Sequence, residues 1–152
     1  MFAENQYFND IEMKKQKPIW KKGRGKLGLL NPLVGSWVAE SDSPMGRLKC
    51  TRVFKPILGE NYIQLIAKWD FAKFSYEEYS IIGVKDNILN FWSFTNDGKN
   101  SHGQLSDGTD IHPEAICFEA QMPAGIARMV YWPNIDGGFN WAVESKNKKG
   151  WK

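Results

Sequence analysis

Two arginines lie in segments whose residues alternate in polarity, Arg52 in LKCTRVF and Arg128 in IARMVYW. In a β-strand, alternate residues point to the same face of the sheet. Each arginine would then share a face with apolar neighbours, so that its guanidinium group points into the protein interior. A guanidinium group is well suited to hold a carboxylate or another planar anion in a dry cavity. The pattern predicts an internal anion site or internal ion pairs.

An arginine inside the protein needs a counter-charge, because an unpaired buried charge costs several kcal/mol. Glu78, Glu119 and Glu144 are the acids that could tie an arginine to a neighbouring strand. The other partner would be the carboxylate of a bound molecule. We predict an internal acid for Arg52 and a ligand for Arg128, whose strand is otherwise apolar.

Aromatic residues on the predicted strands could form the walls of a cavity around a flat, apolar molecule. A tyrosine or a glutamate could complete its polar end. The alternative is that the rings form a plain hydrophobic core. The residues predicted to contact a ligand are Arg52, Tyr76, Glu78, Trp92, Phe94, Phe118, Arg128 and Trp141.

The sequence assigns no catalytic residue, and it predicts no metal site and no cofactor. His102 and His112 lie outside the apolar rows, and a site built on both would also need carboxylates at a spacing that the sequence does not supply. We interpret Cys50 and Cys117 as buried thiols. The chain contains no Gly-x-Ser-x-Gly turn, phosphate-binding loop or dinucleotide fingerprint.

Short strands and turn signals alternate along most of the chain. The sequence has 152 residues, of which 42% are hydrophobic, enough for one globular domain with a sizeable core. Successive strands without a helical pattern between them predict an all-β, antiparallel up-and-down sheet. Closure into a single β-barrel of nine or ten strands would remove the exposed edges of so large a sheet. The predicted strands cover residues 36–41, 46–56, 61–69, 73–84, 87–96, 100–107, 114–122, 126–133 and 138–146.

A Gly-x-Trp step, Gly35-Ser36-Trp37, stands at the start of the first predicted strand. Together with PMGRLKCTRVFKPILGENYIQL, IIGVKDNILNFWSFTNDGK and EAQMPAGIARMVYWP, it resembles the calycins, and more specifically a family of bacterial lipocalin-like proteins. The resemblance covers residues 31–152. It implies a barrel like that of lipocalins and fatty-acid-binding proteins, in which Gly35 and Trp37 are structural because the tryptophan packs across the closed end.

The resemblance brings no established activity with it. We predict a protein that binds a small hydrophobic or amphipathic molecule through an anionic or polar end inside the barrel. An isomerase or cyclase that acts in the same cavity is one alternative. A haem-binding barrel is another, although neither histidine lies on an apolar row.

Basic residues are concentrated near the N-terminus. Residues 1–30 carry seven Lys and Arg against three Asp and Glu, a balance of +4 within a whole-chain charge of +3. We predict a basic arm over residues 1–30, with a short helix in residues 2–13 and an unpacked linker in KKGRGKLGLLNP, before a barrel domain at 31–152. Arms of this kind are usually only solvated, so no nucleic-acid partner is expected. Because the chain lacks a membrane-length apolar run and a signal-like N-terminus, we expect a cytoplasmic protein, and a homodimer stays open.

Overall fold

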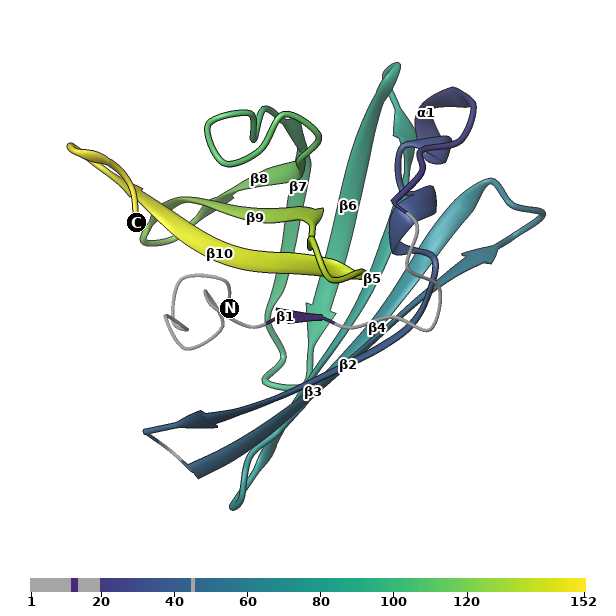
Figure 1. Ribbon diagram of the computed structural model, residues 1–152. Coiled ribbons are helices and arrows are strands. Elements are labelled where there is room, and N and C mark those ends of the chain that lie inside the picture. Colours follow the sequence, from purple (N-terminus) through teal and green to yellow (C-terminus); the bar gives the residue numbers. More distant parts are fainter. Residues whose placement is uncertain (1–11, 14–19, 45) are drawn as a thin grey trace.

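The computed structural model describes residues 12–13, 20–44 and 46–152 of the chain. These residues form two short helical segments and eleven strands (Figure 1). The helical segments are α1 (Gly25–Gly28) and the 3-10 turn η3 (Asn31–Leu33). The strands are β1 (Glu12–Met13), β2 (Gly35–Ser43), β3 (Gly46–Ile57), β4 (Tyr62–Asp70), β5 (Ser75–Lys85), β6 (Ile88–Thr95), β7 (Asn100–Ser106), β8 (Ile116–Met122), β9 (Gly125–Pro133), β10 (Phe139–Asn147) and β11 (Gly150–Trp151).

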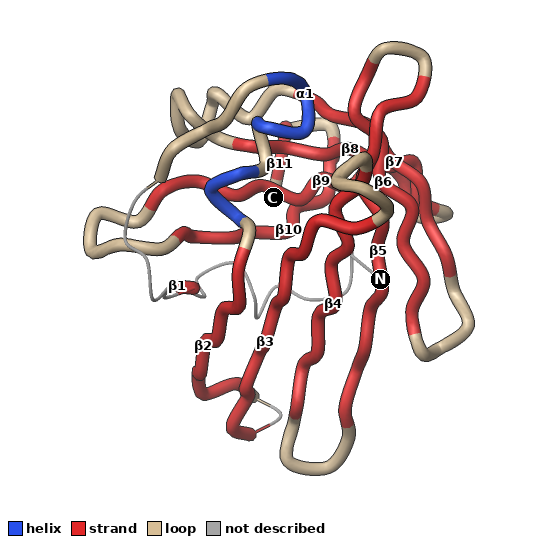
Figure 2. The backbone as a smooth tube through the Cα atoms, turned by 90° about the vertical axis from the view of Figure 1, so that its right-hand side faces the viewer, coloured by secondary structure: helices blue, strands red, loops and turns tan. Residues whose placement is uncertain are grey.

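The strands belong to one antiparallel sheet with the order β1-β10-β9-β8-β7-β6-β5-β4-β3-β2. From β2 to β10, each strand pairs with the strand that follows it in the chain, and β11 pairs with the end of β10. The predicted all-β, antiparallel up-and-down sheet is therefore confirmed. Both helical segments lie at the end of the sheet where β2 begins (Figure 2).

Alternation along the strands separates an inner face from an outer face. In β4 every second residue is buried, from Ile63 through Leu65 and Ala67 to Trp69, while the residues between them are partly exposed. β3 follows the same pattern, with Leu48 to Phe54 inward. Because paired residues of neighbouring strands share a face, the registers extend this inner face across the whole sheet.

The sheet curls so that its first strands face its last strands across the interior. The ring of Trp37 in β2 lies 4.3 Å from that of Phe139 in β10. Phe54 in β3 lies 5.8 Å from Tyr131 in β9, measured between ring centroids. Among the described residues, however, no backbone ladder joins β2 to β1 or to β10, so the sheet is not closed into a barrel. The predicted closure of the sheet into a barrel is not confirmed.

Trp37 links the η3 turn, from which the chain enters the sheet, to strand β10. Its indole N–H donates a hydrogen bond to the carbonyl oxygen of Leu33 in η3 at 2.6 Å, and only 3% of the residue is exposed. Gly35 precedes it with φ of 135°, a conformation that residues with a side chain seldom adopt. The Gly-x-Trp step thus turns the chain from η3 into β2 and packs the indole on β10.

The segment before β2 is more ordered than the sequence indicated. The expectation of an unpacked linker is wrong from Gly25 onward, because α1 forms there and Leu30 is fully buried against the core. Glycines in this stretch allow a close backbone contact, in which the N–H of Gly23 donates to the carbonyl of Gly28 at 2.7 Å. The predicted helix over residues 2–13 is wrong at its end, where β1 pairs with β10, and otherwise lies outside the described residues.

In the part of the chain that the structure describes, no helix combines the length and apolar character needed to cross a membrane.

Replacing Trp37 should reveal its two contributions separately. Trp37→Ala removes the ring that packs on Phe139 and should lower the free energy of unfolding by about 3–5 kcal/mol. Trp37→Phe keeps a ring but leaves the Leu33 carbonyl without the indole donor, and should cost about 1–2 kcal/mol. Urea unfolding measures both. Ile135→Ala, at a turn position that is 99% exposed, is the control, and an equal loss in all three variants would contradict this role for Trp37.

Candidate functional site

Arg52 lies at the centre of the inner face. It belongs to β3, where it pairs with Trp37 of β2 on one side and Ala67 of β4 on the other. Cys50 and Phe54, which lie two residues before and after Arg52 on the same face of β3, are buried as well. The alternation of the strand therefore directs the guanidinium group inward. None of the Arg52 surface is exposed.

Four aromatic rings surround the guanidinium carbon of Arg52. The distances from Cζ to the ring centroids are 4.4 Å for Trp141, 5.4 Å for Tyr131, 5.6 Å for Trp69 and 5.9 Å for Phe54. The rings come from β10, β9, β4 and β3, so the curl of the sheet creates this surrounding. Each ring face within about 6 Å attracts a cation through its quadrupole.

The hydrogen bonds of Arg52 leave part of the group unused. Its Nη2 donates to the hydroxyl oxygen of Tyr131 and lies 3.5 Å from the sulfur of Met129. The Tyr131 hydroxyl in turn donates to the same sulfur at 3.1 Å. Within the described residues, Nε and Nη1 of Arg52 have no hydrogen-bond partner, and no carboxylate forms an ion pair with the group. The internal acid that the sequence led us to expect is therefore not in contact with Arg52.

Glu78 is the nearest acid of the same inner row. Ala67 pairs with Arg52 on one side and with Glu78 on the other, so the two charged residues stand two strands apart, about 10 Å between Cα atoms. Glu78 is 1% exposed and accepts a hydrogen bond from Ser93 at Oε2. Its Oε1 has no hydrogen-bond partner among the described residues. Burial raises the pKa of the Glu78 carboxyl group, although the charge of Arg52 and the Ser93 hydroxyl oppose the shift.

Three more of the predicted site residues face the interior. Tyr76 packs on Trp69 with ring centroids 5.4 Å apart, and Trp69 lies 6.0 Å from Trp141. Phe118 is 1% exposed and contacts Phe91 edge to face at 5.5 Å. Together with Arg52 and Glu78, these residues give the interior one cationic group, one acid and a mostly aromatic wall.

Trp92 and Phe94 do not belong to this wall, and their assignment to an internal cavity is wrong. In β6 the inward residues are Phe91 and Ser93, so the residues between and after them point outward. Phe94 is 57% exposed, and Trp92 stacks on His102 with centroids 5.4 Å apart. Because aromatic residues occupy both faces of the FWSF segment, composition alone could not tell which row is internal.

Arg128 is also on the outer face, so the two arginines do not share a cavity. In β9 it pairs with Glu144 of β10 and Glu119 of β8. Its Nε donates to Glu144 at 2.8 Å, while Nη1 and Nη2 donate to the two carboxylate oxygens of Asp110 at 2.8 and 2.7 Å. The guanidinium carbon lies 4.3 Å from the Trp151 ring centroid.

Arg128 thus ties the loop before β8 and the C-terminal strand β11 to the outer face of the sheet. These segments cover it so well that 1% of its side chain is exposed, compared with 55% for Asp110 and 19% for Glu144. The predicted partners are wrong for both arginines: Arg128 is bound by Asp110 and Glu144 on the outer face, and no carboxylate of the described residues contacts Arg52.

Several residues of the interior were not identified from the sequence. Trp69 and Met129 contact Arg52 from β4 and β9, and Ser93 binds Glu78 from β6. Ser93 has the same parity as Phe91, which is the one signal that could have placed it inside. Burial raises the pKa of the Cys50 thiol to about 11, so this inward cysteine remains a neutral thiol. In the described parts of the chain, no group of three or more potential metal ligands occurs.

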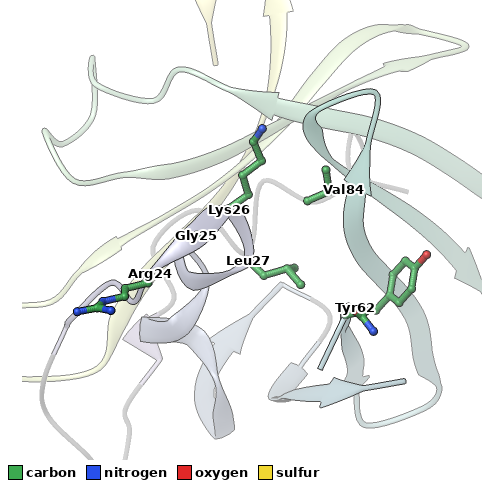
Figure 3. A pocket seen from close by; sticks show the side chains of 7 residues that line it. Arg24, Gly25, Lys26, Leu27, Tyr62 and Val84 are labelled. Atoms are coloured by element: carbon green, nitrogen blue, oxygen red, sulfur yellow. The ribbon is translucent and has the colours of Figure 1, made fainter. Parts of the chain in front are cut away.

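A hollow of about 640 Å³ on the surface lies between α1 and the turns after β3 and β5 (Figure 3). Leu27 points toward Tyr62 and Val84, whereas the side chain of Arg24 extends away from them (Figure 3). Lys26 is already engaged, because its ammonium group donates to the carbonyl oxygen of Asn87 at 2.7 Å. The hollow does not gather the unpartnered polar groups that the interior contains.

Comparisons of the chain with protein-family models, curated proteins and solved structures gave no match. The assignment of function therefore depends on the contacts described above.

Removing the Arg128 charge should destabilise the fold. Arg128→Met leaves Glu144 mostly buried without its partner, and should lower the free energy of unfolding by about 3 kcal/mol. The hydrogen bonds of Arg128 lower the pKa of Asp110, so this contribution is present above the pKa of the unfolded chain and is lost as pH falls. The difference between wild type and variant in urea unfolding should shrink as the pH falls below about 4, the pKa of an aspartate in an unfolded chain.

Arg47→Met is the matched control for this variant. Arg47 pairs with Glu40 and Asp42 but its side chain is 59% exposed, so its replacement should leave the free energy of unfolding nearly unchanged. Equal unfolding free energies for Arg128→Met and wild type at neutral pH would show that the network does not hold the loop and β11 in place.

Proposed function

We propose that this protein binds a small, largely apolar molecule through a carboxylate or similar planar anionic group, and that Arg52 holds that group. The observation that carries the proposal is a guanidinium group with no exposed surface, two of whose nitrogens have no hydrogen-bond partner among the described residues. An arginine in this state is already dehydrated, so binding an anion does not have to remove water from it.

The electrostatics of the interior favour an anion there. A buried charge without a counter-ion costs several kcal/mol, and the four rings around Arg52 return only part of that cost. Glu78 stands two strands away and, among the described residues, forms no ion pair with Arg52, so it neutralises that charge incompletely. A ligand anion would supply the missing charge, and the rings of Trp69 and Trp141 would contact its apolar body.

The proposal includes a barrel of the lipocalin-like kind as the container for this ligand. β1 lies against β2 as well as pairing with β10, and Trp37 already joins β2 to β10 through Phe139. These contacts support closure, because they bring the two ends of the sheet together on either side of β1. The Gly-x-Trp step, whose tryptophan is hydrogen-bonded at the start of β2, supports the proposed similarity to calycins.

Arg52→Met should abolish this binding without unfolding the protein. Methionine fills much of the same volume, and replacing a buried unpaired charge by an apolar residue is often neutral or stabilising. We expect unchanged or higher thermal stability and at least about a tenfold loss of affinity for fluorescent fatty acids, since a charge-assisted hydrogen bond contributes roughly 1.5–3 kcal/mol. Arg47→Met, on the surface, is the control. If Arg52→Met binds the probes as tightly as wild type, Arg52 is not the anchor.

Affinity for an anionic probe should fall as pH rises. A bound anion near Glu78 favours the protonated carboxyl group, so binding takes up a proton in the range between the pKa of the free protein and the higher pKa of the complex. Titrations with the same fluorescent fatty acids between about pH 5 and pH 8 would measure the trend. Glu78→Gln, which cannot ionise, should bind with little pH dependence. If Glu78→Gln keeps the full pH dependence of wild-type affinity, a group other than Glu78 causes that dependence.

A second candidate function is chemistry on the bound molecule, as an isomerase or cyclase. The observation that favours it is Glu78, a buried carboxyl group with a raised pKa and one oxygen without a hydrogen-bond partner in the described part of the structure. Such a group could move a proton next to a carbonyl of the ligand. NMR in D₂O with keto-fatty acids would detect exchange of that proton, expected with wild type and lost in Glu78→Gln. If wild type gives no exchange, the isomerase or cyclase candidate is excluded and ligand binding is the remaining proposal.

A further inference from the structure

The outer face of β3 to β6 carries an apolar row that crosses four strands. The registers pair Val53 with Ile66, Ile66 with Tyr79 and Tyr79 with Phe94, so these four residues share one row of the outer face. Val53 is 36% exposed, Tyr79 55% and Phe94 57%. Monomeric proteins rarely expose a large contiguous apolar patch, and where one occurs it often marks a contact site.

The neighbouring rows show how this patch is bordered. On one side, Ile81 pairs with Trp92, which makes the patch wider over β5 and β6, while Gln64 and Lys55 continue that row on β4 and β3. On the other side, Lys68 pairs with Glu77, so the border carries a positive and a negative charge next to each other. Within the described residues the carboxylate of Glu77 forms no ion pair, whereas the ammonium group of Lys68 lies 3.7 Å from Asp70.

We propose that this outer patch is the contact between two copies of the chain in a two-fold symmetric dimer. A two-fold axis that runs parallel to the strands between β4 and β5 places each β4 opposite β5 of the other copy. Ile66 then meets the partner's Tyr79, and Val53 meets the partner's Phe94. The same operation sets Lys68 opposite the partner's Glu77, twice in the dimer.

Charge complementarity is what favours a second copy over an unrelated partner. A surface that pairs with itself must place opposite charges at positions that the two-fold axis exchanges, and the Lys68–Glu77 border meets this condition. Two sheets can pack face to face in this way at a spacing of about 10 Å, with their twist setting the angle between them. Since the patch is on the outer face, the dimer would leave the interior around Arg52 unaltered.

The first experiment compares oligomeric states by light scattering after size-exclusion chromatography and by sedimentation velocity. Wild type should be a dimer at micromolar concentration. Phe94→Lys should be a monomer with an unchanged circular dichroism spectrum, because Phe94 is exposed and its replacement does not disturb the core. Ile135→Lys introduces the same charge at a 99% exposed turn and should remain a dimer. A monomeric wild type, or a dimeric Phe94→Lys variant, would overturn the proposal.

A charge exchange tests the symmetry of the contact. Glu77→Lys places like charges opposite each other on both sides of the axis and should weaken the dimer by about tenfold. Adding Lys68→Glu exchanges the two charges and should restore the dimer to near the wild-type dissociation constant. A double variant no tighter than Glu77→Lys alone would rule out this two-fold arrangement, even if wild type dimerises through the patch.

Discussion

The structure depends on how a single positive charge is accommodated inside an apolar interior. Arg52 stands in the middle of β3, and the parity of that strand gives its side chain no route to solvent. Water would otherwise stabilise a guanidinium group far better than hydrocarbon can. Here the rings of β9 and β10 replace part of that solvation, which requires the sheet to curl until these strands face β3. The curl and the buried charge are therefore parts of one arrangement.

The two buried arginines illustrate different solutions to the same physical problem. Arg128 is neutralised by two carboxylates, one of which is itself mostly buried, and its five N–H donors are largely used. Its charge is thus neutralised within the chain, and it links the loop before β8 and strand β11 to the outer face of the sheet. Arg52 receives one hydroxyl, one sulfur and aromatic faces, but no carboxylate among the described residues. Only the second environment leaves electrostatic attraction available to a molecule from outside.

Alternation was informative where one face of a strand is solvated and misleading where both faces are covered. In β3 the charged outer residues left no doubt about the inner row, and Leu48 to Phe54 lie where the pattern placed them. In β9 the loop before β8 and the strand β11 cover the outer face, so Val130 is as deeply buried as Met129 and Tyr131. Hydrophobicity then carries no information about direction, and the row with Arg128 was assigned to the wrong face.

Contacts made by loops were even less accessible to sequence reasoning. Asp110 lies 18 residues before Arg128, in a turn-rich stretch whose path depends on Gly108 packing closely against Cys117 and Val130. A Cβ atom at Gly108 would approach their side chains to 3.0–3.2 Å, so the absence of a side chain lets the loop settle on the sheet. Neither the loop path nor its ion pair follows from strand periodicity.

The inner and outer faces both depart from the rule that apolar groups turn inward and charges outward. Arg52 and Glu78 are inside, while Tyr79 and Phe94, which pair with each other in the adjacent row, are outside. Both placements are unfavourable for the isolated chain, since a buried charge loses its hydration and an exposed ring leaves apolar surface in contact with water. A single step of register would exchange the two sets, but it would also move Leu65, Ala67 and Trp69 out of the core. The core residues of β4 therefore hold the register in place, and the charged residues of the inner face and the exposed rings of the outer face follow from that register.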